Sequence, residues 1–187
     1  MKEFITHINT IHSLSSQAEK ALRNICSEVF IVKGKELQAI GNRCTNIYFV
    51  VDGLLRIYYL KNGVDITESF EAEQALVARA DSLFDARPSR KGIQALEDTQ
   101  LVAVNTPRLF TLYDQYHDIE RLFRIVFEQA YVKTVERIEQ LQFHTAEERY
   151  QNLLANAGSI VQRAPLKHIA SYLGITQVSL SRIRAKF

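Results

Sequence analysis

The spacing of apolar residues changes twice along the chain. From Val29 to Val104, short runs rich in Val, Ile, Phe and Tyr alternate with glycine-containing turns, which predicts many short strands. Asp52-Gly53 and Asn62-Gly63 are hairpin signals, because these pairs tolerate the positive φ angles of tight turns. Short strands with glycine corners predict a small β-barrel or β-sandwich.

Helical spacing flanks this strand region. A capping-box spacing that begins at Ser16 predicts a short helix from about Ser16 to Cys26. From Leu109 to Phe143 there is no glycine or proline, and apolar residues recur every three or four positions. The pattern therefore predicts one long helix over this range.

The long helix carries two apolar stripes. We expect one stripe to cover the open end of the barrel, which leaves the other in need of a partner. Pairing with the same helix of a second copy is the preferred interpretation, and packing of both stripes within one chain is the alternative. The predicted dimer contacts are Phe127, Ala130, Thr134, Ile138 and Leu141.

The last segment, APLKHIASYLGITQVSLSRIRAKF, holds two short helical patterns separated by Gly174. Pro165 is tolerated in the first turn of a helix, and Thr176 can cap the second helix. Two short helices joined by a glycine turn form a helix-turn-helix unit. The polar side chains of the second helix are of the kinds that bind bases and phosphates. A plain helical hairpin is the alternative.

Charge is distributed unevenly along the 187 residues. Residues 1–148 hold all 21 acidic residues and 17 of the 23 lysines and arginines, a net charge of −4. Residues 149–187 hold six basic residues and no acidic residue, a net charge of +6. A compact basic segment on an acidic body indicates a polyanionic partner such as nucleic acid, with a solvated basic helix as the alternative.

Several classes of function are excluded by residues that are missing from the sequence. All five histidines fall outside the strand region, which argues against a metal-dependent barrel enzyme. Two cysteines, Cys26 and Cys44, are too few for a disulfide scaffold or an iron–sulfur cluster. No phosphate-binding loop or nucleophile elbow occurs. The sequence thus predicts no catalytic residue, no bound metal and no enzyme.

The N-terminus lacks the apolar core of a signal peptide, and no apolar run approaches the ~20 residues of a membrane span. We therefore expect a cytoplasmic protein without a membrane partner.

Two stretches resemble the Crp/Fnr family of bacterial transcription regulators. TNIYFVVDGLLRIYYL, residues 45–60, is similar to the family's barrel hairpin, and Pro165–Ile183 is similar to its DNA reader. The resemblance covers nearly the whole chain. It implies an α+β fold with a double-stranded β-helix, a cyclic-nucleotide-binding-like barrel, in residues 1–107. A dimerisation helix in 108–144 and a winged helix-turn-helix in 145–187 would follow.

The resemblance implies double-stranded DNA and a second copy of the chain as partners, with RNA polymerase as a further candidate. By position, Gln177, Val178 and Arg182 match the family's base readers, and Thr176 and Ser181 lie near phosphates. Many members carry Glu where Val178 stands, and valine offers only apolar contact, for example to a thymine methyl, so we expect a different operator. The predicted DNA-binding residues are Lys167, Thr176, Gln177, Val178, Ser179, Ser181, Arg182 and Arg184.

Salt should weaken this binding, because phosphates would be neutralised by basic side chains, namely Arg149, Lys167, Arg184 and Lys186. The short connection from Asn156 to Arg163 predicts an abbreviated or missing β wing.

The sensor region departs from the pattern of cyclic-AMP-binding members. Arg79-Ala80 stands where they have Gly-Glu, Ser89-Arg90 inverts their Arg-Ser pair, and Thr134-Val135 replaces their Thr-Ser. We therefore predict no cofactor and no ordinary response to cyclic AMP. Another small-molecule effector would use a pocket formed by Arg79, Ser89, Arg90 and Thr134, and a solvated charged loop is the alternative.

Two other functions remain as alternatives. A ligand-binding or protein-interaction module with a helix-turn-helix that no longer reads DNA would tie Arg182 into an internal contact. A cyclic-nucleotide sensor with an altered binding segment would point Arg90 into the barrel pocket.

Overall fold

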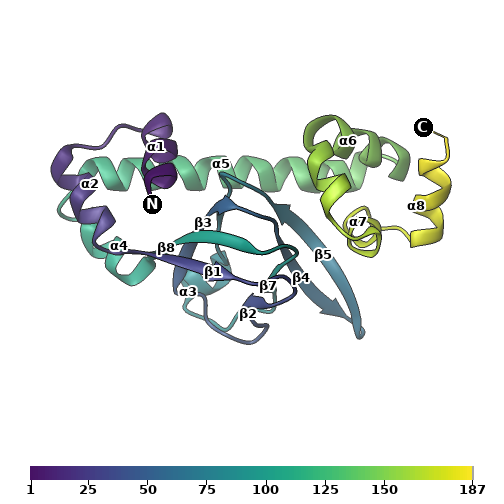
Figure 1. Cartoon of the computed structure of the whole chain (residues 1–187), viewed down its shortest axis with the longest axis horizontal. Helices are drawn as coiled ribbons and strands as arrows, with labels where there is room; N and C mark the ends of the chain where they lie inside the picture. The colour runs from purple at the N-terminus through teal and green to yellow at the C-terminus, as the bar shows by residue number, and fades with distance from the viewer. Residues whose placement is uncertain (187) are drawn as a thin grey trace.

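The computed structural model describes residues 1–186, and eight strands in it form two antiparallel sheets (Figure 1). The first sheet has the order β1-β8-β3-β6 and the second β2-β7-β4-β5. Within the described residues they form a sandwich and do not close into the predicted barrel. The strands are β1 (Cys26–Ile31), β2 (Glu36–Gln38), β3 (Asn46–Asp52), β4 (Leu55–Lys61), β5 (Val64–Glu71), β6 (Leu76–Val77), β7 (Gly92–Ala95) and β8 (Thr99–Asn105).

Alternate residues of the central strands pack into two different cores. Tyr48 and Val50 of β3 face the second sheet, where they meet Ile57 and Ile93. The residues between them face outward, yet they are buried too, because helices cover that side of the first sheet. This double burial explains why β3 is an almost continuous apolar run rather than an alternating one. At its end, Gly53 takes φ +111°, as the hairpin signal predicts.

Helices cover the outer face of the first sheet. They include α1 (Lys2–Ile11), α2 (Ser16–Arg23) and the first half of α5 (His117–Phe143). Ile119, Leu122, Phe123 and Val126 of α5 are buried there. The predicted stripe therefore lies against a sheet face rather than over the end of a barrel.

The predicted single helix from Leu109 to Phe143 is wrong, because the chain breaks between Tyr113 and His117. It forms α4 (Thr106–Tyr113) and α5, joined by a turn in which the amides of Gln115 and Tyr116 donate to Leu112. No glycine or proline marks the turn. The break allows Leu109 and Ile119 to enter the same core, so packing rather than local sequence ends α4.

Three further helices escape the sequence pattern, namely α1, α3 (Ala80–Asp85) and α6 (Ala146–Arg163). The predicted helix from Ser16 to Cys26 is too long at its C-terminal end, since β1 already begins at Cys26. Its cap is Ser15 rather than Ser16, because the Ser15 side chain accepts from the amide of Ala18.

Three helices follow α5 and end the described chain. They are α6 (Ala146–Arg163), α7 (Leu166–Tyr172) and α8 (Gln177–Arg184). Thr145 and Glu148 form a reciprocal capping box at the start of α6, which kinks at Ala157. The segment 156–163 is helical, and residues 106–186 contain no strand, so no β wing lies there. The predicted C-terminal domain also includes Phe187, which lies outside the described residues.

No helix within residues 1–186 has the length and apolar character needed to cross a membrane.

Candidate nucleic-acid interface

The helix-turn-helix forms as predicted, with α7 and α8 joined by a tight turn. Gly174 takes φ +71°, which a side chain would disfavour, and the amide of Ile175 donates to the carbonyl of Ala170. Thr176 caps α8 by accepting from the amide of Ser179 at 3.1 Å. Leu180 is fully buried in a core that it shares with α6 and α7, so α8 is fixed to α7.

One face of α8 is free to meet a partner. Gln177, Val178, Ser181, Arg182 and Arg184 are exposed, and none of their side chains has a hydrogen bond or ion pair within residues 1–186. Among residues 1–186, Arg182 is therefore not tied into an internal contact. Val178 has 62% of its surface exposed, as an apolar reader would.

The other three predicted DNA-binding residues are placed differently. The hydroxyls of Thr176 and Ser179 lie 3.0 Å apart and bond to each other at the start of α8. Lys167 is exposed on α7, where its charge helps to lower the pKa of Asp65 in β5.

Two predicted phosphate ligands outside α8 have other partners. Arg149 donates to the carbonyl of Leu173 at 2.9 Å and to that of His144 at 2.5 Å, so it holds α6 to the end of α7. Lys186 lies 2.7 Å from Glu147. Arg149 thus supplies the donor that the open end of α7 needs, and its part in neutralising phosphates stays a prediction.

A cavity of about 1380 Å³ separates the second sheet, α5 and the helix-turn-helix. Arg79 and Thr134 line this cavity, whereas Ser89 and Arg90 do not. Ser89 is buried and donates to Asp81, and Arg90 is exposed to solvent. Arg79 and Thr134 thus line the cavity without Ser89 and Arg90, although the next residue of their loop, Lys91, does line it.

The cavity walls are of mixed charge. Arg79 is buried, and its Nε lies 3.7 Å from Asp81, too far for a hydrogen bond. Lys133 and Arg137 of α5 contribute positive charge, and Glu68 and Glu71 of β5 contribute carboxyl groups. Burial raises the pKa of Glu71.

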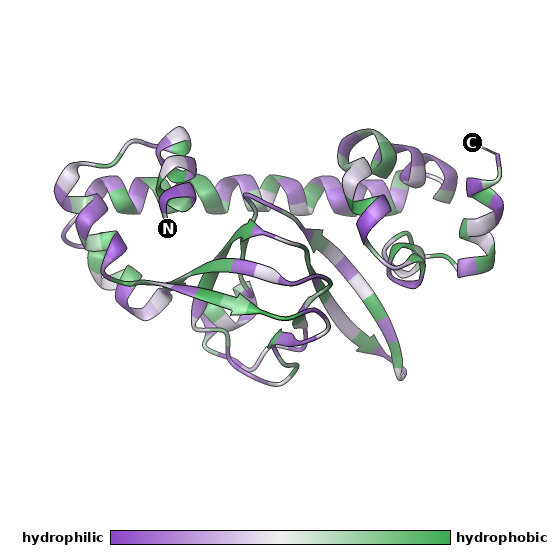
Figure 2. Ribbon diagram, viewed as in Figure 1, coloured by the Kyte–Doolittle hydropathy of each residue, from purple (hydrophilic) through white to green (hydrophobic). Residues whose placement is uncertain are grey.

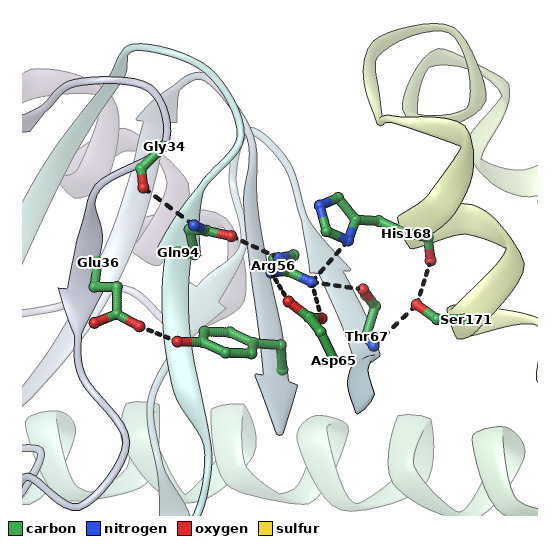
Figure 3. Close-up of polar contacts among 9 residues, drawn as sticks. Gly34, Glu36, Arg56, Asp65, Thr67, Gln94, His168 and Ser171 are labelled. Atoms are coloured by element: carbon green, nitrogen blue, oxygen red, sulfur yellow. Dashed lines mark hydrogen bonds and ion pairs between the residues drawn. The ribbon is translucent and has the colours of Figure 1, made fainter. Parts of the chain in front are cut away.

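The helix-turn-helix packs against β5 of the second sheet through α7 (Figure 3). The buried Arg56 of β4 donates to Nδ1 of His168 in α7 at 2.8 Å. Its two Nη atoms bind the carboxylate of Asp65 at 2.5 and 2.6 Å. Ser171 accepts from the amide of Thr67 at 3.1 Å.

Further contacts extend the surface on which the C-terminal helices pack against the sandwich, which we call the docking surface. Arg163 at the end of α6 binds both Glu73 and Glu97, each at 2.7 Å. The rings of Phe70 and Tyr172 meet with centroids 5.3 Å apart. The docking surface thus combines ion pairs with aromatic packing.

Burial and neighbouring charges shift the pKa values of the ionisable groups at this surface. Burial and then the charge of Arg56 lower the pKa of His168 from 6.5 to about 4, so the imidazole is neutral and accepts from Arg56. The bond from Arg56 lowers the pKa of Asp65, and the bond from Arg163 lowers that of Glu73 to about 2.

Solved structures of known regulators superpose on most of this chain. FixK2 from Bradyrhizobium japonicum is 20% identical, with 87% of this chain and 84% of that chain covered and a TM-score of 0.72. A Crp/Fnr family transcriptional regulator from Eubacterium rectale is 19% identical, with 93% and 83% covered and a TM-score of 0.74. The chain has the Crp/Fnr fold.

The c-di-GMP-responsive global regulator CLP from Xanthomonas campestris shares the Crp/Fnr fold as well, at 13% identity, 92% and 91% coverage and a TM-score of 0.72. No family model and no curated protein sequence matches the chain. The resemblance to the Crp/Fnr family is thus confirmed at the level of the fold.

The second half of α5 leaves apolar side chains uncovered in the single chain. Figure 2 shows apolar and polar segments alternating along the whole of α5, beyond the part that packs on the sheet. Of the predicted dimer contacts, Phe127 is half-buried against Phe84 and Phe123, because its stripe begins within the monomer core. The other four are exposed, and the pattern missed two exposed apolar neighbours, Tyr131 and Val132.

Sequence reasoning missed the docking surface of this Crp/Fnr fold entirely. Its one local signal was Arg56, a charged residue in the centre of the apolar run LLRIYYL. A buried arginine in such a strand requires acceptors. Nothing in the sequence indicated that one of them is His168, which lies 112 positions further along the chain.

Proposed function

We propose that the chain is a sequence-specific, DNA-binding transcription regulator of Crp/Fnr type that acts as a cytoplasmic homodimer. The observation that carries the proposal is the free outer face of α8, with Gln177, Val178, Ser181 and Arg182 exposed on a capped helix. Figure 1 places α8 at the end of the molecule away from the two sheets, where a duplex would meet no obstacle from them.

The side chains on this face suit both parts of DNA recognition. Arg182 has donors for guanine or phosphate, Gln177 can pair with adenine, and Val178 can contact a thymine methyl group. Because residues 149–187 hold no acidic residue, the reader itself adds no carboxylate that would repel the phosphate backbone.

A dimer through α5 supplies the second reader. Ala130, Thr134, Ile138 and Leu141 are exposed and line the cavity, so a second copy of α5 would cover both these side chains and the cavity's open side. The two α8 helices would enter successive major grooves, ~34 Å apart on a two-fold site.

The cavity is the candidate site for a small-molecule effector other than cyclic AMP. Basic side chains outnumber carboxyl groups in its lining, and Glu68 is paired with Lys91 at 2.5 Å, so the cavity suits an anionic ligand. Arg90, which an altered cyclic-nucleotide site would need, is exposed outside it.

Fluorescence anisotropy with labelled random duplex DNA tests the proposed function. The wild-type protein should bind at low salt and weaken steeply as salt increases. Arg182→Ala should lose about 1–3 kcal/mol of binding free energy, because Arg182 contacts a base or a phosphate. The matched control is Arg43→Ala, which removes an exposed arginine from the sensor region and should bind like the wild type.

Equal affinity of the wild type and Arg182→Ala would contradict the proposed orientation of α8. A dimer that binds no duplex at low salt would instead favour a ligand-binding or protein-interaction module.

A further inference from the structure

The contact between α7 and the second sheet is built around one guanidinium group, that of Arg56. Arg56 has only 2% of its surface exposed, and all three of its nitrogen atoms are engaged. Nε donates to Gln94 at 2.8 Å, and the Nη atoms donate to Asp65, Thr67 and His168. Three of these four partners lie in the second sheet, as Arg56 itself does, and only His168 belongs to the helix-turn-helix.

The sheet residues fix the direction in which Arg56 donates to the reader. Asp65 binds both Nη atoms, and Gln94 binds Nε, so bonds within the sheet alone fix the plane of the guanidinium, without any contribution from α7. The hydrogens of Nη1 have further acceptors in Asp65 and Thr67, whereas moving α7 away would take from the buried His168 the donor to its Nδ1 atom. The Nδ1 atom of His168 therefore has one favoured position relative to β4.

Holding α7 also holds α8. The amide of Ile175 donates to Ala170, and Leu180 of α8 packs in one core with Ile169 and Leu173 of α7. The two helices thus move as a unit. Within residues 1–186, none of the docking contacts described above uses a side chain of the exposed face of α8, so docking leaves these side chains open to DNA.

We infer that Arg56 is a positioning residue for DNA reading, which holds α7 through His168 and thereby sets the angle of α8 relative to the dimer helix. This inference rests on the proposed function. A single reader needs no such restraint to bind half a site. Two readers on one two-fold site do, because both must meet their grooves at once.

The test compares a full two-fold duplex, selected from a random pool by the wild-type protein, with a duplex that carries one half-site. Arg56→Gln should weaken binding to the full site about 10-fold or more, as loss of a charged hydrogen bond of about 1.5–3 kcal/mol allows. Its affinity for the half-site should stay within about 2-fold of the wild type, because the free face of α8 is unchanged.

A pair of variants at His168 tests the same contact from the reader's side and leaves Arg56 bound to Asp65. His168→Leu removes the acceptor and should reproduce the selective loss on the full site. His168→Asn keeps an acceptor near the Nδ1 position and should bind both duplexes as the wild type does. This pair decides the question if Arg56→Gln does not fold.

The results separate this inference from the proposed function. A wild-type protein that selects no duplex refutes both. A wild type that binds DNA, with His168→Leu and His168→Asn indistinguishable on the full site, refutes only the positioning role. Equal losses on the full site and the half-site also refute it, since Arg56 would then support folding alone.

Discussion

Acidification should destabilise the protein through His168 in particular. In the folded protein the pKa of His168 is lowered from 6.5 to about 4, first by burial and then by the positive charge of Arg56. Lys167 lowers it further, whereas Asp65 raises it. The folded state therefore binds this proton more weakly than the unfolded state does. The contribution of the neutral His168 to the free energy of unfolding is complete above pH 6.5 and is lost as the pH falls towards about 4.

The magnitude follows from the size of the shift. A difference of about 2.5 pKa units corresponds to about 3 kcal/mol at most, of which about 2 kcal/mol is lost by pH 5. His168 is buried, so solvent screening reduces this value little. The loss should be concentrated where α7 meets β4 and β5.

Urea unfolding of the wild type and of His168→Asn at pH 7.5 and pH 5.0 provides the assay. Carboxylates such as Glu73 titrate alike in both proteins, so their effects cancel in the comparison. The wild type should lose about 2 kcal/mol more than His168→Asn between the two pH values. Equal losses would refute the assignment of a neutral, accepting imidazole to His168.

Three further variants have effects that can be read directly from the structure. Gly53→Ala should lower the free energy of thermal unfolding by more than about 2 kcal/mol, because Gly53 takes φ +111° and the added Cβ would lie 2.5 Å from the Thr99 hydroxyl. An unchanged Tm would contradict this packing. Thr145→Ala should lower the free energy of unfolding by about 1 kcal/mol, measured in the same way, because it removes the capping box of α6. Ile138→Glu should yield monomers in analytical ultracentrifugation, whereas Glu139→Gln should not, and a dimeric Ile138→Glu would exclude α5 as the interface.

The strands and the reader were predictable because their signals are local. Asp52-Gly53 and Asn62-Gly63 mark the turns on either side of β4, and the apolar runs between glycines mark the buried strands. Gly174 and Thr176 likewise mark the end of α7 and the cap of α8. In each case the residue that ends or caps an element lies within two positions of that element in the sequence.

Other features depend on contacts between distant residues and left no such signal. The break between α4 and α5 places Leu109 and Ile119 in one core without a glycine or proline. Arg149 reads as a phosphate ligand, yet it binds the carbonyl of Leu173, 24 positions away. The pairing of Arg56 with His168 is of the same kind, since charge and spacing show which side chains need partners but not which partners they find.

Selection of duplexes from a random-sequence pool by the wild-type dimer at low salt tests the central claim most directly. The account predicts enrichment of an inverted repeat whose half-sites lie about one helical turn apart, as two α8 helices related by a two-fold axis require. Failure to enrich any sequence, with the dimer confirmed in the same sample, would contradict the assignment of α8 as a DNA reader.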